Sequence, residues 1–145
     1  MTKGVKPTRR IGRPVSRFEK LEAIPTHCPE SLHRYLKTIY PYRFASLTAL
    51  YEKMLTQFID TKMWEHGVDW RKPRTSKVEI EGEAAKTGWV LVNVQVEPDL
   101  KQRVRELSVK QDVSMATIAY TAMYWWAMFV MPASSVAGPK PKKKE

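Results

Sequence analysis

The feature that most constrains what this chain can fold into is a segment of strictly alternating character, WVLVNVQV, which runs from Trp89 to Val96. Alternate side chains of a strand point to opposite faces, so the valines of this segment share one face. Leu91, Asn93 and Gln95 share the other face. Only the valine face belongs in a core, which predicts a half-buried strand with an outer face open to solvent or to a ligand.

Two helices are predicted after this strand. Pro98 and Asp99 provide helix-start residues, and apolar residues then repeat at helical spacing as far as the polar turn at residues 110–112. Ser114 is expected to cap the second helix, because its hydroxyl can accept a hydrogen bond from an unpaired N–H of the first turn. That helix is predicted to run to about Met131 and to stop before Pro132.

The same order of elements is predicted in the first half of the chain. Residues 24–59 align without a gap with residues 92–127, at a constant offset of 68, and apolar positions match apolar positions. The matched pairs are Ile24 with Val92, Cys28 with Val96, Leu32 with Leu100, Leu36 with Val104, Ile39 with Leu107, Leu50 with Ile118 and Phe58 with Trp126. Ser46 matches Ser114. Duplication explains this pattern, and a chance match of two amphipathic helix pairs is the alternative.

The predicted elements of this first copy are a short strand near residues 24–28, a helix over about residues 30–39, a break at Pro41 and a helix from Ser46 to about Lys62. The length of 145 residues suits one domain with tails. We expect that domain to span residues 18–134, with repeat one at 22–62, a linker at 63–88 and repeat two at 89–131. Gly67, Pro73 and Gly82 interrupt the linker, so only a short helix or turn is expected there.

Both ends of the chain are basic and lack hydrophobic periodicity. Residues 1–17 are predicted to form a disordered basic arm and residues 135–145 a disordered basic tail. The arm lacks the apolar core of a secretory signal, and the single cysteine, Cys28, suits a reducing compartment. A cytoplasmic bacterial protein is therefore expected. The lysines of the tail also resemble a nuclear import signal, which matters only inside a eukaryotic cell.

The formal charge of +10 and the pI near 9.8 favour a polyanionic partner, and nucleic acid in preference to an anionic membrane surface. One cysteine and three histidines give no recurring metal-ligand spacing, so no metal and no cofactor are expected. The sequence also lacks a nucleophile paired with a base and a phosphate-cradling glycine loop. An enzyme is therefore not expected.

The run VNVQVEPDL, followed by Ser114 at the start of a hydrophobic helix, resembles the ribbon-helix-helix superfamily of Arc and MetJ. CPESL, followed at the same distance by Ser46, resembles that pattern in weaker form. The resemblance covers about half of the chain. It implies an α+β, mostly α fold in which two tandem units form an intramolecular pseudo-dimer, with one two-stranded antiparallel ribbon and four main helices. Tandem members of this type include TraY and the accessory proteins that bind T-DNA borders in relaxosomes.

The resemblance implies double-stranded DNA as the partner, with the ribbon in the major groove. Asn93 and Gln95 would then contact bases, since side-chain amides can pair with adenine. Pro25 and His27 occupy the matching positions of the first copy, so we expect asymmetric readout. The alternative is that Asn93 and Gln95 are simply solvated residues of an exposed strand face.

Phosphate contacts are expected at the start of the second helix of each unit, where backbone N–H groups and the helix dipole favour an anion. Ser46 and Ser114 mark those positions, with Arg43 and Lys110 close by in the sequence. Either serine can equally serve as a cap for stability alone. In the arm, the sequence RRIGRP is similar to an AT-hook, which predicts minor-groove or backbone contacts from Arg9, Arg10 and Arg13.

Several functions remain open at this stage. Within DNA binding, the resemblance favours an accessory factor of conjugative transfer that acts with a relaxase, and a transcriptional repressor or plasmid partition protein is the alternative. Residues 113–138 carry no charge and are long enough to span a bilayer, but Trp and Tyr lie through their middle, so no membrane is expected. The aromatic residues of the last helix exceed what one core face needs, and a patch for another protein or a second copy is one interpretation of the surplus. A third class of function, a membrane-associated or purely protein-binding module that uses this helix, is therefore a further alternative.

Overall fold

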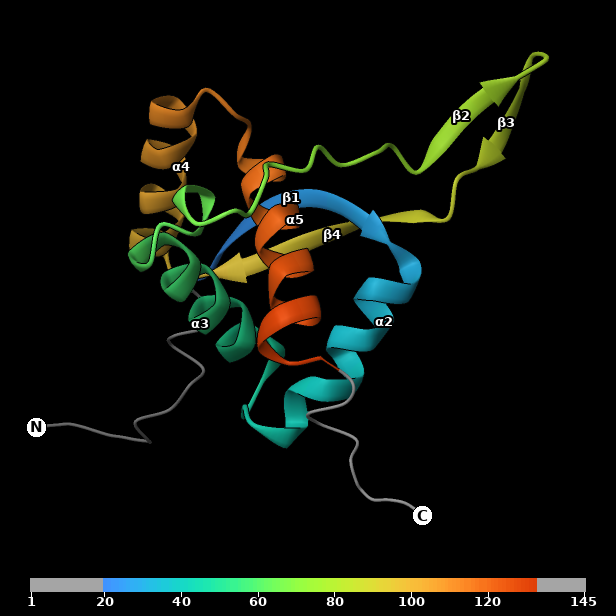
Figure 1. Ribbon diagram of the computed structural model, residues 1–145. Coiled ribbons are helices and arrows are strands. Elements are labelled where there is room, and N and C mark those ends of the chain that lie inside the picture. The colour runs from blue at the N-terminus through green and yellow to red at the C-terminus, as the bar shows by residue number, and fades with distance from the viewer. Residues whose placement is uncertain (1–19, 133–145) are drawn as a thin grey trace, which may run out of the picture.

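A computed structural model describes residues 20–132 of the chain, which form an α+β structure (Figure 1). Its strands are β1 (Glu22–Pro29), β2 (Lys77–Ile80), β3 (Glu83–Lys86) and β4 (Trp89–Val96). Its α-helices are α2 (Glu30–Ile39), α3 (Leu47–Asp60), α4 (Pro98–Gln111) and α5 (Met115–Trp125). Short helical turns are η1 (Tyr40–Tyr42), η2 (Met63–Glu65) and the π-helical η3 (Trp126–Val130), which continues α5.

β1 and β4 pair antiparallel, and this pair is called the ribbon below. One face of the ribbon is buried in the core, where β1 and β4 contribute alternate residues. These residues are Ile24, Thr26, Cys28, Val92, Val94 and Val96. In Figure 1, α5 crosses in front of the ribbon, so the opposite face of the ribbon points away from the helices.

The two halves of the chain correspond closely in space. α4 begins 68 residues after α2, and α5 begins 68 residues after α3. In the ribbon, Pro25 lies opposite Asn93, and these two residues are themselves 68 positions apart. The second helix of each half packs against the strand of the other half, α5 on β1 and α3 on β4. An approximate two-fold axis therefore passes through the middle of the ribbon and exchanges the two halves.

The expectation of one two-stranded sheet is wrong, because the linker forms a second one. β2 and β3 pair antiparallel as a hairpin that projects from the body of the molecule (Figure 1). Its turn, Glu81–Gly82, has positive φ at both residues, 53° and 83°, which is the geometry of a two-residue hairpin turn. The short helix expected in the linker is present as η2.

Other boundaries differ by a few residues from the expected ones. β1 extends at both ends beyond residues 24–28. The last helix follows α-helical geometry only to Trp125 and then widens into η3, which ends at Val130. The backbone N–H of Met131 bonds to the carbonyl of Trp126, so the π-turn satisfies the end of this helix.

α5 lies between two layers, which explains why the helix lacks charge. The ribbon covers one side, and the linker crosses the other side, where the backbone N–H of Arg71 donates to Oγ1 of Thr121 at 2.9 Å. Every residue from Thr117 to Met123 is buried. Among residues 20–132, no single helix is long and apolar enough to cross a bilayer; only α4 and α5–η3 taken together reach that length and character, and they are bent by 105°.

The aromatic residues form one cluster between α3, α5 and the linker. The ring of Phe58 lies 5.6 Å from that of Trp125 and 5.8 Å from those of both Trp64 and Trp70. Trp64 and Trp70 stack on each other at 5.7 Å. The surplus aromatic residues therefore serve in part to hold the linker against the helices.

Candidate nucleic-acid interface

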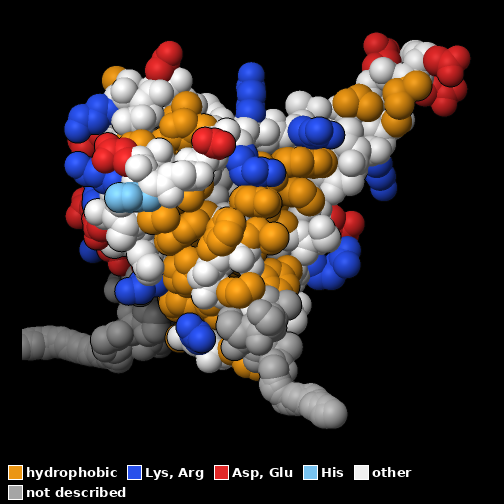
Figure 2. Space-filling view, viewed as in Figure 1, with side chains coloured by type: hydrophobic (Ala, Val, Ile, Leu, Met, Phe, Trp, Pro, Cys, Tyr) orange, Lys and Arg blue, Asp and Glu red, His pale blue; other side chains and the backbone are white. Residues whose placement is uncertain are grey.

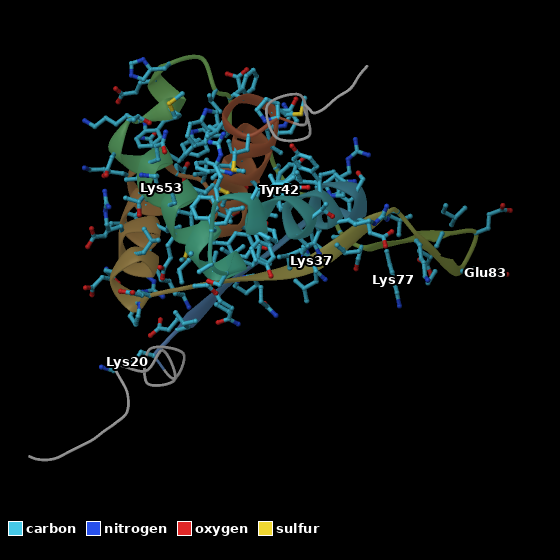
Figure 3. All side chains as sticks on the ribbon, turned by 90° about the horizontal axis from the view of Figure 1, so that it is seen from below. Lys20, Lys37, Tyr42, Lys53, Lys77 and Glu83 are labelled. Atoms are coloured by element: carbon cyan, nitrogen blue, oxygen red, sulfur yellow. The ribbon has the colours of Figure 1, made fainter. Side chains whose placement is uncertain are left out.

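The outer face of the ribbon includes three cross-strand pairs, Ala23 with Gln95, Pro25 with Asn93, and His27 with Leu91, and the end pair on this side, Pro29 with Trp89, is half-buried. None of the six side chains in the three pairs is charged. Asn93 and Gln95 are exposed, as is Pro25, whereas His27 is half-buried. Figure 3 shows the ribbon along one side of the molecule with the helices on the other, which leaves this face open to a large partner. The sequence correctly predicted which residues share this face.

Pro25 does not interrupt β1. In a two-stranded ribbon both strands are edges, so a proline is tolerated where its missing N–H would face solvent. β1 continues for eight residues through Pro25. The first copy therefore contributes a full-length strand, but its outer face offers a histidine and no amide side chain.

The second helices begin as the sequence predicted. Oγ of Ser46 accepts a hydrogen bond from the backbone N–H of Ala49 at 3.1 Å, and Oγ of Ser114 accepts one from the backbone N–H of Thr117 at 3.0 Å. Both serines are therefore N-caps. The capping interaction is confirmed, and phosphate contact at these positions stays a prediction.

The start of α5 is fixed directly to the ribbon. Oγ1 of Thr26, which is 1% exposed, donates to the backbone carbonyl of Ala116 at 2.7 Å. Ala116 lies in the first turn of α5, two residues after the Ser114 cap. The N–H groups at this helix end are thereby held at a set position relative to the outer face of the ribbon.

Arg43 and Lys110 are both exposed and lie shortly before the two caps. Arg43 ends the η1 turn, where its backbone N–H bonds to the carbonyl of Tyr40 at 3.1 Å. Lys110 lies in the last turn of α4. Phosphate contact by Arg43 and Lys110 stays a prediction, and the three arm residues Arg9, Arg10 and Arg13 lie outside the described residues.

Leu91 is a member of this face that was not singled out as a site residue. Its side chain is 57% exposed on the outer face, opposite His27. Apolar side chains in this position can contact the methyl group of thymine. The alternation of β4 predicts the position of Leu91, but an exposed leucine by itself gives no sequence signal of a base contact.

The buried face of the ribbon carries the Cys28 thiol, and His33 lies on the adjoining helix α2. Burial raises the pKa of the Cys28 thiol to about 11, so the thiol stays protonated at neutral pH. Burial lowers the pKa of His33, and the nearby Lys37 adds to this effect. Within residues 20–132, no group of three His, Cys, Asp or Glu side chains is arranged to hold a metal ion.

No protein-family model matches the chain, and comparison with curated proteins and with solved structures returns no match.

Proposed function

We propose that this protein is a tandem ribbon-helix-helix protein that binds double-stranded DNA with the ribbon in the major groove. The observation that carries the proposal is the pairing of Pro25 with Asn93, because it brings the two strands together symmetrically about equivalent positions. The ribbon-helix-helix fold requires such a symmetric pair of strands, and here one chain supplies both. A two-stranded ribbon has dimensions that the major groove accepts.

The side chains of the outer face suit the reading of bases. Asn93 and Gln95 each present a donor and an acceptor, and both are exposed on β4. Leu91 adds an apolar contact from the same strand. β1 contributes His27 and Pro25 in place of amides. A DNA site with one strongly specified half and one weakly specified half is the expected target.

Affinity would come mainly from the phosphate backbone, because the outer face itself carries no charge. The capped starts of α3 and α5 offer N–H groups to phosphates on either side of the ribbon. Arg43 and Lys110 would add cationic contacts, and the basic arm would follow the duplex away from the ribbon.

For the biological process, the tandem arrangement favours an accessory factor of conjugative DNA transfer in a bacterial cytoplasm, where it would act with a relaxase on plasmid DNA. We favour this role because two units in one chain can differ from each other, which suits a DNA site whose two halves are not identical. A repressor or partition protein would use the same surface, and the genes next to this one would distinguish these roles.

The proposal is tested by selection from a library of random duplexes. The full chain should enrich one motif of unequal halves, and its affinity for that motif should fall steeply as salt rises. Enrichment of no motif, together with no duplex binding at low salt, would contradict it. A mobility shift with the selected duplex and a scrambled duplex separates specific binding from electrostatic binding.

A further inference from the structure

On the side of α5 opposite the ribbon, the linker carries a row of cations. Arg71, Lys72, Arg74 and Lys77 are exposed, and Lys86 is exposed on the neighbouring strand β3. Figure 2 shows Lys and Arg side chains between the body and the hairpin, beside a broad area of hydrophobic side chains. These five residues, Arg71, Lys72, Arg74, Lys77 and Lys86, are called the linker strip below.

Two arginines of the linker strip lie over aromatic rings. The guanidinium of Arg71 is 3.8 Å from the ring centre of Tyr124, and that of Arg74 is 6.0 Å from the ring centre of Trp89. Trp89 in turn meets Tyr120 edge-on at 5.0 Å. Cations are therefore held at the faces of rings that are themselves fixed in the core.

A cavity of about 450 Å³ opens at one end of the strip. Its walls include His66, Arg71, Tyr124, Trp125 and Phe129. The Phe129 side chain is 70% exposed, although it is large and apolar. One acidic residue, Asp69, also lines the cavity. The cavity thus offers the exposed ring of Phe129 together with the cation of Arg71.

The linker is fastened to the rest of the molecule at Trp70 and Arg71, beside the cavity. The backbone N–H of Arg71 donates to Thr121 in the buried centre of α5, and Trp70 stacks on Trp64. Trp70 also packs edge-on against Phe58 at 5.8 Å. A ligand that entered the cavity would meet a preformed surface.

We propose that the linker strip is a second nucleic-acid site, which takes a single-stranded DNA segment. The exposed ring of Phe129 provides a stacking surface for an unpaired base, and a row of cations beside it follows the phosphates, which is the combination that single-strand binding uses. The bases of a duplex are already stacked on each other and present no free face to Phe129. Asp69 disfavours a phosphate inside the cavity, so a base occupies the cavity and the phosphates lie along Arg71, Lys72 and Arg74.

The cavity end of this site is separate from the proposed duplex site, since α5 lies between the ribbon and Arg71 (Figure 1). The other end of the strip approaches the end of the ribbon, because Arg74 lies over Trp89 at the start of β4. One molecule would therefore hold a duplex on one side and an unpaired strand on the other. That combination suits a step of DNA processing at which a duplex has been opened. The proposed single-strand site does not depend on whether the ribbon binds DNA.

The test measures fluorescence anisotropy of the full chain with two labelled probes of about 20 nucleotides, oligothymidine and an abasic strand with the same number of phosphates. Oligothymidine should bind at least about tenfold more tightly than the abasic strand, because only it has bases to stack. Phe129→Ala should weaken oligothymidine binding about fivefold or more and leave abasic binding unchanged. Met128→Ala is the matched control, since it removes an exposed apolar side chain of the same turn that is not aromatic.

Charge is tested separately from stacking. Arg71→Gln with Arg74→Gln should weaken binding of both probes, whereas Lys37→Gln with Lys53→Gln, which removes the same charge from α2 and α3, should change neither by more than about twofold. Equal affinity for the two probes, or undiminished oligothymidine binding by Phe129→Ala, would overturn the proposal. Loss of oligothymidine binding on Asn93→Ala with Gln95→Ala would also overturn it, because the single strand would then lie on the ribbon. Failure of duplex binding alone leaves these results intact, so the two proposals fail independently.

Discussion

Pro25 lies directly opposite Asn93 at the centre of the ribbon, and the same two residues are equivalent under the 68-residue repeat. Every other ribbon pair follows from this one: Ile24 meets Val94 and Thr26 meets Val92, as a two-fold axis at the central pair requires. The axis relates a proline to an asparagine on the outer face. The backbone is therefore nearly symmetric and the surface offered to a partner is not.

The hydrogen bond between Thr26 and the first turn of α5 should be measurable as stability. Thr26→Val keeps the shape and the strand preference of the side chain but loses the donor to the Ala116 carbonyl. We expect a loss of about 1 kcal/mol in the free energy of unfolding, from urea denaturation. Thr38→Val is the control, because the exposed Thr38 hydroxyl donates to the Arg34 carbonyl within its own helix. If both substitutions lowered the free energy of unfolding equally, the Thr26 hydrogen bond would stabilise the protein no more than the exposed Thr38 hydrogen bond.

Aspartate at the two caps separates capping from phosphate contact. Ser46→Asp and Ser114→Asp keep a side chain that caps helices well, so unfolding free energy should change by no more than about 0.5 kcal/mol. The added carboxylate would meet the phosphate proposed at the same helix end, so duplex affinity at low salt should fall by about tenfold. Unchanged duplex affinity would mean that both serines act as caps alone.

The β2–β3 hairpin should be dispensable for folding. The backbone N–H of Thr87 donates to the carbonyl of Ser76 at 3.2 Å, so these two residues already lie side by side. A two-residue Asn-Gly turn can therefore replace residues 77–86 and join Ser76 to Thr87. Since the removed side chains are almost all exposed, the unfolding free energy should change by no more than about 0.5 kcal/mol.

Trp70→Ala provides the contrast within the same linker. It removes a ring that packs on Phe58 and Trp64, and it should cost about 2 kcal/mol or more. A hairpin deletion as damaging as Trp70→Ala would show that the hairpin contributes to the core.

The Cys28 thiol should report on opening of the ribbon. Its pKa of about 11 and its buried position leave almost no thiolate in the folded protein at pH 8, so iodoacetamide should label it far more slowly than in guanidinium. Between the ordinary thiol pKa of 9.0 and the raised value, the unfolded chain releases a proton that the folded chain keeps. Stability should therefore fall as pH rises through this range, and Cys28→Ser should remove that part of the dependence. Native labelling at the rate of a free thiol would contradict the buried placement.

Local chemistry made most of the main elements predictable. Pro98 opens α4, and Ser46 and Ser114 cap α3 and α5, because each signal acts within one helical turn. The strict alternation of β4 fixed which residues lie on the outer face. The resemblance to ribbon-helix-helix proteins gave the expectation that β1 pairs with β4, and in the observed register Pro25 and Asn93, which are 68 positions apart, lie opposite each other.

Features that depend on distant partners could not be predicted in the same way. The hairpin has four-residue strands rich in charge, and its turn uses Glu81 at a positive φ that glutamate seldom adopts. The aromatic cluster joins Trp70 to Phe58 across the chain, and no periodicity relates a linker residue to a helix. The long uncharged stretch was ambiguous because only the layers on both sides of α5 explain its composition.

The most direct test of the ribbon as a DNA reader is the affinity of Asn93→Ala with Gln95→Ala for the selected duplex, compared with a scrambled duplex at the same salt. Affinity for the selected duplex should fall by about 100-fold, toward that for the scrambled one, because each amide that reads a base contributes about 1–3 kcal/mol. Binding of the scrambled duplex and the thermal midpoint should not change, and Gln102→Ala on α4 serves as the matched amide control. Undiminished affinity of the double variant for the selected duplex would contradict the proposed mode of binding.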